Sequence, residues 1–482
     1  MNFATHERFT TIHEHPVAKS AGDEHAAAGE PMRVTRALPL SPPIFNSMPH
    51  DLVSDFQARG LIHQSTDSSQ LREWLSTPGR RVYAGFDPTA DSLHVGHLVA
   101  LVLLRRVAHA GHEPVALIGG ATGMIGDPSG RSEERNLLSP DELAANIAGV
   151  ERQIRGILLS DAGHDVGGGT SVTPHHVVNN ADWMRGVGYL EFLRDVGKHV
   201  PLSQMLGKDS VKSRLERDGG LSYTEFSYML LQAWDFVHLS DVLDCRVQIG
   251  GSDQWGNITA GIELGRRLRS RELHGITCPL LTKSDGTKMG KTASGAIWLD
   301  PRRTSPYRFY QYWINLDDDD AGRCLARLTP LSLDELTDLD AKRAANPAAR
   351  DSQKRLAEEL TRLVHGDAGL SAARQATEIF FGAEIGQLDD SQLAEIFADV
   401  PSREFSRLTL DGEGLPLVEA LTDTGLAQSR GAARRTIEQG GAYVNNRRIS
   451  DVAYRLTAKD LAGAATLVLR SGKKSYAIAR FQ

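Results

Sequence analysis

An alternation of apolar strand and helix patterns limits the possible folds of this chain more than any other feature. Residues 82–86 predict a strand, residues 87–89 a turn and residues 98–104 a helix. A second strand pattern, 114–120, ends in two glycines. This order predicts an α/β fold with a parallel sheet and helices on both faces. Ligands of such sheets bind at the carboxyl ends of the strands, where these glycines lie.

Length and composition limit the class of protein. The chain has 482 residues, 40% of them hydrophobic, which suits about three globular domains. It has no run of about 18 apolar residues, so we expect no membrane span, and its N-terminus does not resemble a secretory signal. Its cysteines, Cys245, Cys278 and Cys324, are too far apart to predict a metal site or a disulfide framework. Few cysteines without a predicted disulfide suit a reducing compartment, the cytoplasm.

The net charge of −7 would by itself argue against a nucleic-acid partner. The distribution of charge reverses that argument. Residues 415–482 contain eleven Arg or Lys and five Asp or Glu, a net charge of +6, which leaves −13 on the rest of the chain. A basic C-terminal module on an acidic body is typical of a nucleic-acid-binding appendage.

Other segments divide the chain further. Residues 1–47 are predicted to be disordered, because they have few large apolar residues and a proline-rich end. We expect them to be either the result of a start assigned upstream of Met48 or a tail without a function, although the sequence leaves open a functional extension. Residues 317–400 have a helical, polar pattern, and the acidic tract 317–320 is expected to begin it as a solvated cap. An acidic, glycine-rich joint, 411–414, precedes the basic module.

Two segments have the residue types needed to bind the phosphates of ATP from two sides. His94 and His97 lie at the start of a predicted helix, where unpaired backbone N–H groups and the helix dipole attract anions. Their spacing would also suit a metal, but the sequence has no further ligands at a suitable spacing. Lys288, Lys291 and Thr292 lie far downstream on a glycine-containing loop, where mobile lysines can stabilise charge that develops in a transition state.

The lysine loop also resembles the end of a Walker A loop, which would indicate a P-loop nucleotidase. The glycine that this motif requires five residues before Gly290 is Asp285. The loop also does not connect a first strand to a long helix. A P-loop protein is therefore poorly supported.

A glycine-rich loop, 119–131, follows the second predicted strand. Its glycine spacing does not match a dinucleotide-binding fingerprint. Asp127 in this loop could pair with a substrate ammonium group. Arg131 and Arg135 could contact phosphate or tRNA, or could belong to a solvated face.

Tyr228, Gln232 and Asp235 are spaced i, i+4 and i+7 and would share one face of a helix. They would either bind a small polar ligand or form the solvent stripe of an ordinary amphipathic helix, and the spacing alone favours the stripe. Downstream, a predicted strand ends in glycines and is followed by Asp253 and Gln254. A carboxylate and an amide at that place suit a ribose diol and a carboxylate substrate.

Together these segments resemble bacterial tyrosyl-tRNA synthetases, which are class I aminoacyl-tRNA synthetases. The resemblance extends from about Leu52 to the C-terminus, and its most specific parts are residues 83–89 (YAGFDPT) and 250–257 (GGSDQWGN). It implies three domains: a Rossmann-like catalytic domain at 48–316 that binds tyrosine and ATP, an α-helical anticodon-binding domain at 317–405, and a small α+β RNA-binding domain at 415–482.

The resemblance also implies a role for each residue of the site. Tyr83 and Asp235 would contact the substrate phenol. Tyr228, Gln232 and Asp127 would hold its ammonium group. Gln254 and Asp87 would lie near the substrate and the α-phosphate. The implied ATP-binding residues are Gly85, Asp87, His94, His97, Gly251, Asp253 and Lys291. The implied catalytic residues are His94, His97, Lys288, Lys291 and Thr292, and no protein ligand for a metal is implied.

The implied reaction has two steps. The tyrosine carboxylate attacks the α-phosphate of Mg-ATP, giving tyrosyl-adenylate and pyrophosphate, and the terminal ribose hydroxyl of tRNA(Tyr) then takes the tyrosyl group. ATP with Mg²⁺ is thus a substrate, and neither a tightly bound cofactor nor a covalent enzyme intermediate is implied. The implied partners are L-tyrosine, ATP and tRNA(Tyr), with no membrane, in a cytoplasmic homodimer.

The basic module resembles a small RNA-binding fold shared with a ribosomal small-subunit protein. It would place Arg430, Arg434 and Arg435 on a helix and Arg447 and Arg448 on short strands, where they would contact tRNA phosphates. The alternative is a basic surface without a specific partner.

Two other functions compete with this interpretation. A tryptophan-specific synthetase is disfavoured by Tyr83 and Asp235, which suit a phenol oxygen, and by the RNA-binding module. A catalytically silent RNA-binding regulator is disfavoured by the intact histidines and lysines, which such a protein would have no reason to keep.

Overall fold

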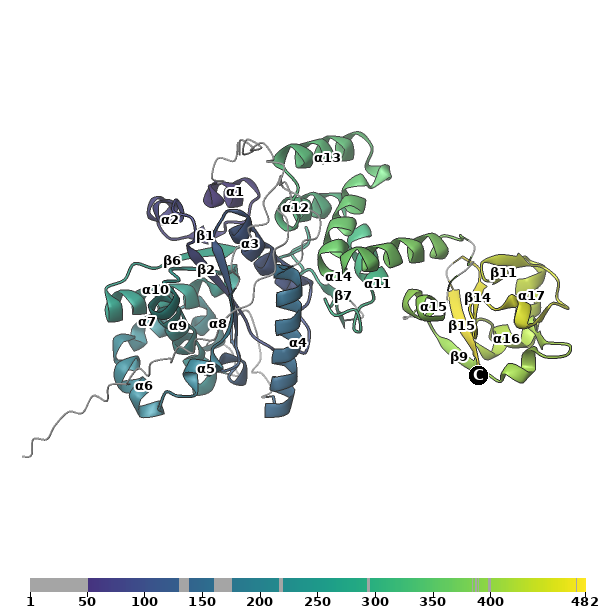
Figure 1. Cartoon of the computed structure of the whole chain (residues 1–482), viewed down its shortest axis with the longest axis horizontal. Helices are drawn as coiled ribbons and strands as arrows, with labels where there is room; N and C mark the ends of the chain where they lie inside the picture. Colours follow the sequence, from purple (N-terminus) through teal and green to yellow (C-terminus); the bar gives the residue numbers. More distant parts are fainter. Residues whose placement is uncertain are drawn as a thin grey trace, which may run out of the picture. The chain divides into compact units, whose positions relative to one another are not determined.

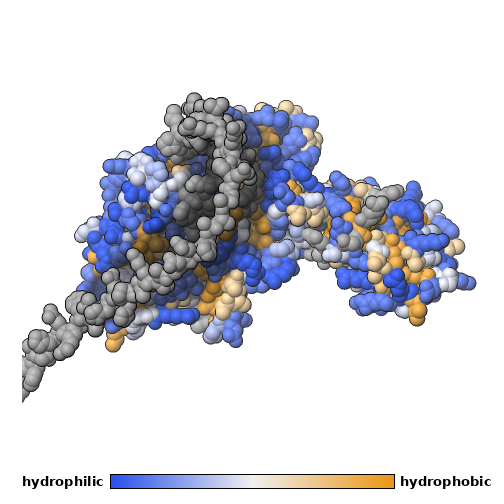
Figure 2. All heavy atoms as spheres, in the orientation of Figure 1, coloured by the Kyte–Doolittle hydropathy of each residue, from blue (hydrophilic) through white to orange (hydrophobic). Residues whose placement is uncertain are grey.

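The computed structural model of the chain describes residues 51–129, 138–159, 176–215, 220–292, 295–383, 385, 388, 390–397, 400–473 and 475–482. The predicted disorder of residues 1–47 lies outside this range, as do Arg131 and Arg135. Hydrophilic residues cover most of the described surface on the face that Figure 2 shows. No helix within the described ranges is long and apolar enough to cross a membrane.

A six-stranded sheet forms the centre of the first part of the chain (Figure 1). All neighbouring strands are parallel except the edge pair β1 and β6, which is antiparallel. The predicted α/β fold with a parallel sheet is confirmed, and the two predicted strands correspond to β2 and β3. The strand order is β1 (Gln64–Ser65), β6 (His274–Cys278), β5 (Val247–Gly251), β2 (Arg81–Phe86), β3 (Glu113–Ile118) and β4 (His176–Asn179).

Helices cover both faces of this sheet, because alternate residues of a strand point to opposite sides. Ala84 and Phe86 of β2 share an apolar core with α3 (Leu98–His109) and α4 (Pro140–Leu158). Tyr83 points to the other face and packs against Phe236 of α9 (Tyr223–Leu243), which in turn packs on α10 (Trp255–Arg269). The carboxyl end of β2 lies where the strand order reverses, which is where such sheets bind ligands.

Shorter elements complete this part of the chain. The three cysteines are buried and form no disulfide. The shorter elements are α1 (Leu52–Ala58), α2 (Ser68–Leu75), α5 (Ala181–Met184), α6 (Tyr189–Asp195), α7 (Leu202–Leu206), α8 (Asp209–Leu215), β7 (Lys291–Thr292) and β8 (Gly295–Ala296).

A helical region follows, in agreement with the pattern predicted for residues 317–400. The longest of its helices, α14, is interrupted at Gly366, where a φ of 70° is not helical. Its helices within the described ranges are α11 (Pro306–Ile314), α12 (Asp318–Leu328), α13 (Leu333–Ala345), α14 (Asp351–Phe380) and α15 (Asp390–Ile396).

The acidic tract at the start of α12 is only partly the solvated cap that we expected. Asp317 is exposed and immediately precedes the helix, where a carboxylate is favoured by the helix dipole. Asp320 instead is buried, and its Oδ1 accepts a hydrogen bond from the backbone amide of Ser284 at 3.0 Å. A run of four identical residues gives no sign that one of them makes such a distant contact.

The last part of the chain contains a five-stranded sheet. An arginine-bearing helix followed by short strands, as the sequence predicts, is present as α17, β11 and β12. The strand order is β12 (Arg447–Ile449), β11 (Ala442–Val444), β14 (Thr466–Ser471), β15 (Ser475–Phe481) and β9 (Ser402–Phe405); the remaining elements are α16 (Leu417–Asp423), α17 (Arg430–Glu438) and the pair β10 (Leu415–Pro416) and β13 (Arg455–Leu456).

This sheet begins earlier than residue 415, the expected start of the module. β9 pairs in parallel with β15, and the rings of Phe405 and Phe481 stack with centroids 5.5 Å apart. The joint at 411–414 therefore lies within the folded unit. A four-residue strand with mostly polar side chains gives no alternating pattern from which it could have been predicted.

Candidate functional site

The segment 94–97, which we call the histidine turn, lies between β2 and α3 and carries His94 and His97. His94 Nδ1 accepts a hydrogen bond from the amide of Gly96 at 3.0 Å, and the amide of His94 donates to His97 Nδ1 at 3.1 Å. Burial of its ring, and then the neighbouring His94, lower the pKa of His97 to about 3. His97 is therefore neutral at working pH. Because its Nδ1 accepts, its proton lies on Nε2, which remains able to donate to an anion.

The lysine loop lies directly against the histidine turn. The amide of Ile297 donates to the carbonyl of Gly290 at 2.8 Å, and the amide of Val95 donates to the carbonyl of Ile297 at 3.0 Å. A Cβ atom on Gly290 would lie 3.1 Å from Cβ of Val95. The two segments that the sequence analysis paired, almost 200 residues apart, are therefore neighbours in the fold.

The predicted lysines lie on either side of this contact. Lys288 is exposed and pairs as an isolated bridge with Thr282. The backbone of Lys291 and Thr292 forms β7, and the side chains of these two residues lie outside what the structure describes. Only Lys288 of the predicted catalytic residues in this loop therefore has a described side-chain position.

Tyr83 and Asp235 come from β2 and α9 and lie close together in the protein interior. Both are buried, and the Tyr83 hydroxyl makes no hydrogen bond with any residue in the described part of the chain. Burial, followed by the charge of Asp235, raises the pKa of Tyr83. A buried hydroxyl without a partner is costly, and a ligand that bonds to it would remove that cost.

Two donors hold the Asp235 carboxylate. Asn180 Nδ2 donates to Oδ2 and Trp183 Nε1 donates to Oδ1, each at 2.9 Å. Burial raises the pKa of Asp235 to about 7, against the opposing effect of these two hydrogen bonds, and Asp87 adds a smaller upward shift. Each carboxylate oxygen has a second lone pair, so Asp235 can still accept a bond from a ligand hydroxyl.

The other polar residues of α9 face the carboxyl ends of β2 and β5. Tyr228 donates to Asp87 Oδ2 at 2.8 Å, and Gln232 Nε2 donates to Gln254 Oε1 at 3.2 Å. Gln254 Nε2 in turn donates to Asp127 Oδ2 at 2.7 Å. These residues form a polar network at the strand ends in two hydrogen-bonded groups: Tyr228 joins Asp87, and Gln232, Gln254 and Asp127 form a chain. The Tyr83 hydroxyl belongs to neither group.

The solvent-stripe interpretation of α9, which the spacing alone favoured, is therefore wrong. Tyr228 is 6% and Asp235 2% exposed, and Gln232 is half-buried. Residues on the opposite side of the helix, such as Met229 and Ala233, pack in a separate apolar cluster. The helix is covered on both sides, and its polar face is satisfied by other polar side chains.

Of the two predicted nucleotide-binding glycines at the strand ends, Gly85 leaves open space and Gly251 does not. Gly85 is exposed within the central strand, and a Cβ there would meet only Leu117, at 4.0 Å. A Cβ on Gly251 would lie 2.6 Å from Oδ1 of Asp253. Burial, and then the charge of Asp127, raise the pKa of Asp253, whereas Lys288 lowers it, so this carboxylate lies within electrostatic range of the lysine loop.

Sequence reasoning missed residues that organise the site. Asn180 is fully buried; besides its bond to Asp235, its Nδ2 donates to Thr122 Oγ1 at 3.1 Å, and Thr122 donates to Asp87 at 2.8 Å. Asn257 is buried as well and donates to Gln232 Oε1 at 2.9 Å. Asn257 belongs to the specific string 250–257, and Asn180 directly follows β4, so the rule that ligands meet strand ends could have found both.

The five arginines predicted to contact tRNA are exposed on the C-terminal part. Arg430, Arg434 and Arg435 lie on α17, and Arg447 and Arg448 lie on β12. An Arg448 Nη donates to the carbonyl of Gln439, just after α17, at 3.4 Å. Arg448 therefore lies at the C-terminal end of α17.

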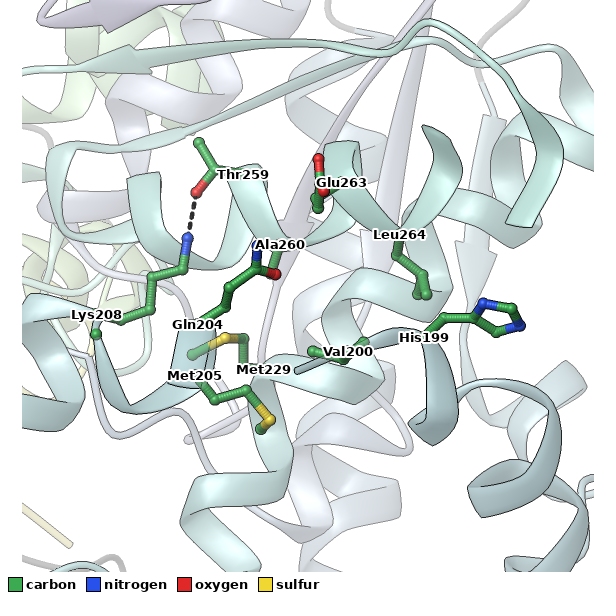
Figure 3. A pocket seen from close by; sticks show the side chains of 11 residues that line it. His199, Val200, Gln204, Met205, Lys208, Met229, Thr259, Ala260, Glu263 and Leu264 are labelled. Carbon is green, nitrogen blue, oxygen red and sulfur yellow. Dashed lines mark hydrogen bonds between the residues drawn. The ribbon is translucent and has the colours of Figure 1, made fainter. Parts of the chain in front are cut away.

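A cavity of about 370 Å³ lies apart from these residues, between α7, α9 and α10 (Figure 3). Met205, Met229 and Leu264 contribute apolar side chains to it, and at its edge Lys208 Nζ donates to Thr259 Oγ1 at 2.7 Å. It contains none of the predicted site residues. It adjoins the face of α9 opposite to the polar network.

Comparison with known proteins gives similarity over almost the whole described chain. Residues 77–382 match the family model of class I tRNA synthetases (W and Y), and residues 392–479 match that of a tyrosine–tRNA ligase C-terminal domain. The tyrosine–tRNA ligase of Rhodopirellula baltica is 57% identical over 90% of this chain and 97% of its own length, and that of Geobacillus stearothermophilus is 46% identical over 89% and 100%. A crystal structure of a C-terminally truncated Aspergillus nidulans mitochondrial tyrosyl-tRNA synthetase matches with a TM-score of 0.63 at 32% identity, over 68% of this chain and 94% of that one.

Proposed function

The chain belongs to the tyrosine–tRNA ligases of class I, and we propose that the polar network at the ends of β2 and β5 is its amino-acid site. As such a ligase it joins tyrosine to tRNA in a reaction driven by ATP. One observation above all supports the location of the site. The buried Tyr83 hydroxyl, without a described partner and next to Asp235, offers hydrogen bonds to a phenol oxygen in an otherwise apolar environment.

The substrate in this proposal lies with its phenol between Tyr83 and Asp235 and its ammonium group near Asp127. Gln232 and Gln254 then orient the amino-acid end, because their amides already form a chain of hydrogen bonds to Asp127. Tyr228, bonded to Asp87, closes the pocket from α9. This arrangement would direct the substrate carboxylate toward the histidine turn.

ATP in this proposal lies across the strand ends with its phosphates on the histidine turn. The open space over Gly85 leaves room for the nucleotide, and Asp253, whose carboxylate lies against Gly251, would bond the ribose. Asp87 lies near the α-phosphate, His94 and His97 donate to the triphosphate, and Lys288, Lys291 and Thr292 stabilise the departing pyrophosphate. Mg²⁺ arrives with ATP as part of the substrate, and positioning with charge stabilisation supplies the rate.

We assign tRNA recognition to the parts of the chain after residue 316. The helices of 317–405 form the anticodon-binding domain, and the C-terminal sheet, which starts at β9, forms the RNA-binding domain together with its five exposed arginines. Exposed guanidinium groups on α17 and β12 suit backbone phosphates. Because tRNA charging supplies the ribosome, we place the ligase in the cytoplasm.

ATP–pyrophosphate exchange with L-tyrosine, L-phenylalanine and L-tryptophan tests the proposed site. We expect exchange with tyrosine and, at equal concentrations, at least about 100-fold less with phenylalanine, which would leave the buried Tyr83 hydroxyl without a partner and give Asp235 no phenol hydroxyl to accept. Equal exchange with phenylalanine would place the phenol elsewhere. Folded protein that bound tRNA but exchanged with none of the three would favour a silent RNA-binding role.

We further propose that the ligase acts as a homodimer. Large apolar side chains are exposed on α6, on α7, at the end of α8 and at the start of α9, all within 35 residues of sequence. The hydroxyls of two of them, Tyr189 and Tyr223, form a hydrogen bond of 3.1 Å. A concentration of this kind exceeds the usual scatter of exposed apolar residues and suits a two-fold interface. The residues are Tyr189, Leu190, Leu202, Leu206, Leu215 and Tyr223.

Tyr223→Asp should separate the dimer, because it places a charge in this apolar surface. Light scattering after gel filtration should give twice the 52.5 kDa chain mass for the unchanged protein and the single mass for the variant at low micromolar concentration. Val242→Asp alters an equally exposed residue at the other end of α9 and should leave the dimer intact. A single-chain mass for the unchanged protein would refute the dimer.

A further inference from the structure

The lysine loop is fixed at its centre, although the lysines flank that centre. The amide of Met289 donates to the carbonyl of Leu281 at 2.8 Å, and the Met289 side chain is buried in the main core. Gly290 is also buried, has a φ of 81° and accepts a hydrogen bond from Ile297. The exposed Lys288 thus extends from a backbone that is held in place.

The anchor of Gly290 is a side chain from the following helix. Its amide donates to the hydroxyl oxygen of Tyr312, on α11, at 2.9 Å. Tyr312 is half-buried against the main core and packs edge-on against the fully buried Trp313, with ring centroids 4.9 Å apart. Burial raises the pKa of Tyr312 to about 12, so its hydroxyl stays protonated at working pH.

Gly290 also lies against the histidine turn, on the side away from Tyr312. A Cβ at residue 290 would already lie within 3.5 Å of both Val95 and Gly96 of the histidine turn. The loop backbone is therefore in close contact with the histidine turn on one side and with Tyr312 on the other. This contact fixes how far the lysines lie from the phosphates that the histidines bind.

We propose that Tyr312 is a positioning residue of the activation reaction, which holds Gly290 so that the two flanking lysines meet the departing pyrophosphate. This inference rests on the proposed function. Without the hydroxyl, the loop would have to become ordered during the reaction. The free energy needed for this ordering would then add to the activation barrier at the step in which the lysines bind the developing charge. The tyrosine site would not be affected, because none of its hydrogen bonds involves this loop.

Tyr312→Phe tests this role, because it removes only the hydroxyl. We expect the kcat of ATP–pyrophosphate exchange to fall by about three- to tenfold, as for the loss of one hydrogen bond, with the KM for tyrosine unchanged. Tyr310→Phe is the matched control: it lies on the same helix, and its hydroxyl bonds to Arg374 instead of the loop. That control should keep the full kcat.

Three results would overturn the proposal. The first is an unchanged or raised kcat in Tyr312→Phe, and the second is an equal fall in Tyr310→Phe. The third is a loss of activity that appears in the KM for tyrosine or that parallels a lower melting temperature. Each of these results compares a variant with the unchanged protein, which must itself show exchange. If the unchanged protein shows no exchange, the proposed function fails instead.

Discussion

His97→Ala should lower the kcat of tyrosine activation by about 100- to 1000-fold, the usual loss when one donor to a developing negative charge is removed. His97 is neutral, because its pKa is lowered to about 3, and its Nδ1 accepts from the amide of His94. Nε2 is therefore the donor toward the triphosphate. Stopped-flow measurement of adenylate formation should show this loss in kcat, with the KM for tyrosine within about twofold.

Two conservative variants sharpen this prediction. The side-chain nitrogen of His97→Gln reaches the place of Nε2, whereas that of His97→Asn reaches the place of Nδ1. The glutamine variant should therefore retain more activity than the asparagine variant. Higher activity in the asparagine variant would mean that Nδ1 is the donor, contrary to its hydrogen bond with the amide of His94.

In the protein without bound ATP, the lowered pKa of His97 keeps its ring neutral near neutrality. A group with a pKa of about 3 does not titrate between pH 5 and 9. If activation falls as the pH is lowered from 8 to 6, another group must take up the proton. Asp235, with a pKa of about 7, is the buried group at the site that titrates in this range.

The sequence predicted the centre of the fold well, for a physical reason. The strands β2 and β3 are buried on both faces, so they appear as apolar runs, and the histidine and lysine segments have residue types that few other functions need. The pairing of these segments depends on contacts between Gly290, Ile297 and Val95. No local pattern contains that information; it came from the resemblance to a family.

The sequence failed where burial depends on distant partners. The spacing in α9 is the same for a solvent stripe and for a buried polar face, and only the packing on both sides decides between them. Asn180 lies 55 residues from Asp235, so its hydrogen bond to that carboxylate left no local trace. The contact of Asp320 with Ser284 and the short strand β9 escaped prediction for the same reason.

Asp235→Asn should lower kcat/KM for tyrosine by about 100-fold and remove its dependence on pH. The ionised carboxylate accepts from Asn180 and Trp183 and has lone pairs left for the phenol, whereas an amide would point its NH₂ group at one of these donors. Losing hydrogen bonds to a charged group costs about 1.5–3 kcal/mol each. In the unchanged protein kcat/KM should fall as the pH drops through about 7, since the carboxyl then takes up a proton.

Trp183→Phe tests whether the pKa of Asp235 causes this pH dependence. It removes one of the two donors that favour the ionised form, so the pKa of Asp235 should rise and the acid limb of the profile should move to higher pH. Exchange measured from pH 6 to 9 should then show a large loss at pH 7 that is partly recovered at pH 9. A loss that is equal at every pH would assign Trp183 to packing only.

The raised pKa of Asp235 also predicts a cost to the fold. Between pH 4 and 7 the native carboxyl keeps a proton that the unfolded chain has released, so ionisation of Asp235 removes stability as the pH rises toward 7. Asp235→Asn lacks this contribution. The melting temperature of the unchanged protein minus that of the variant should therefore fall from pH 5 to pH 7 and then level off. A difference in melting temperature that stays constant from pH 5 to pH 7 would place the ionisation of Asp235 outside this range. Above pH 7 the carboxylate would thus favour substrate binding while it opposes folding, as expected of a group kept for chemistry.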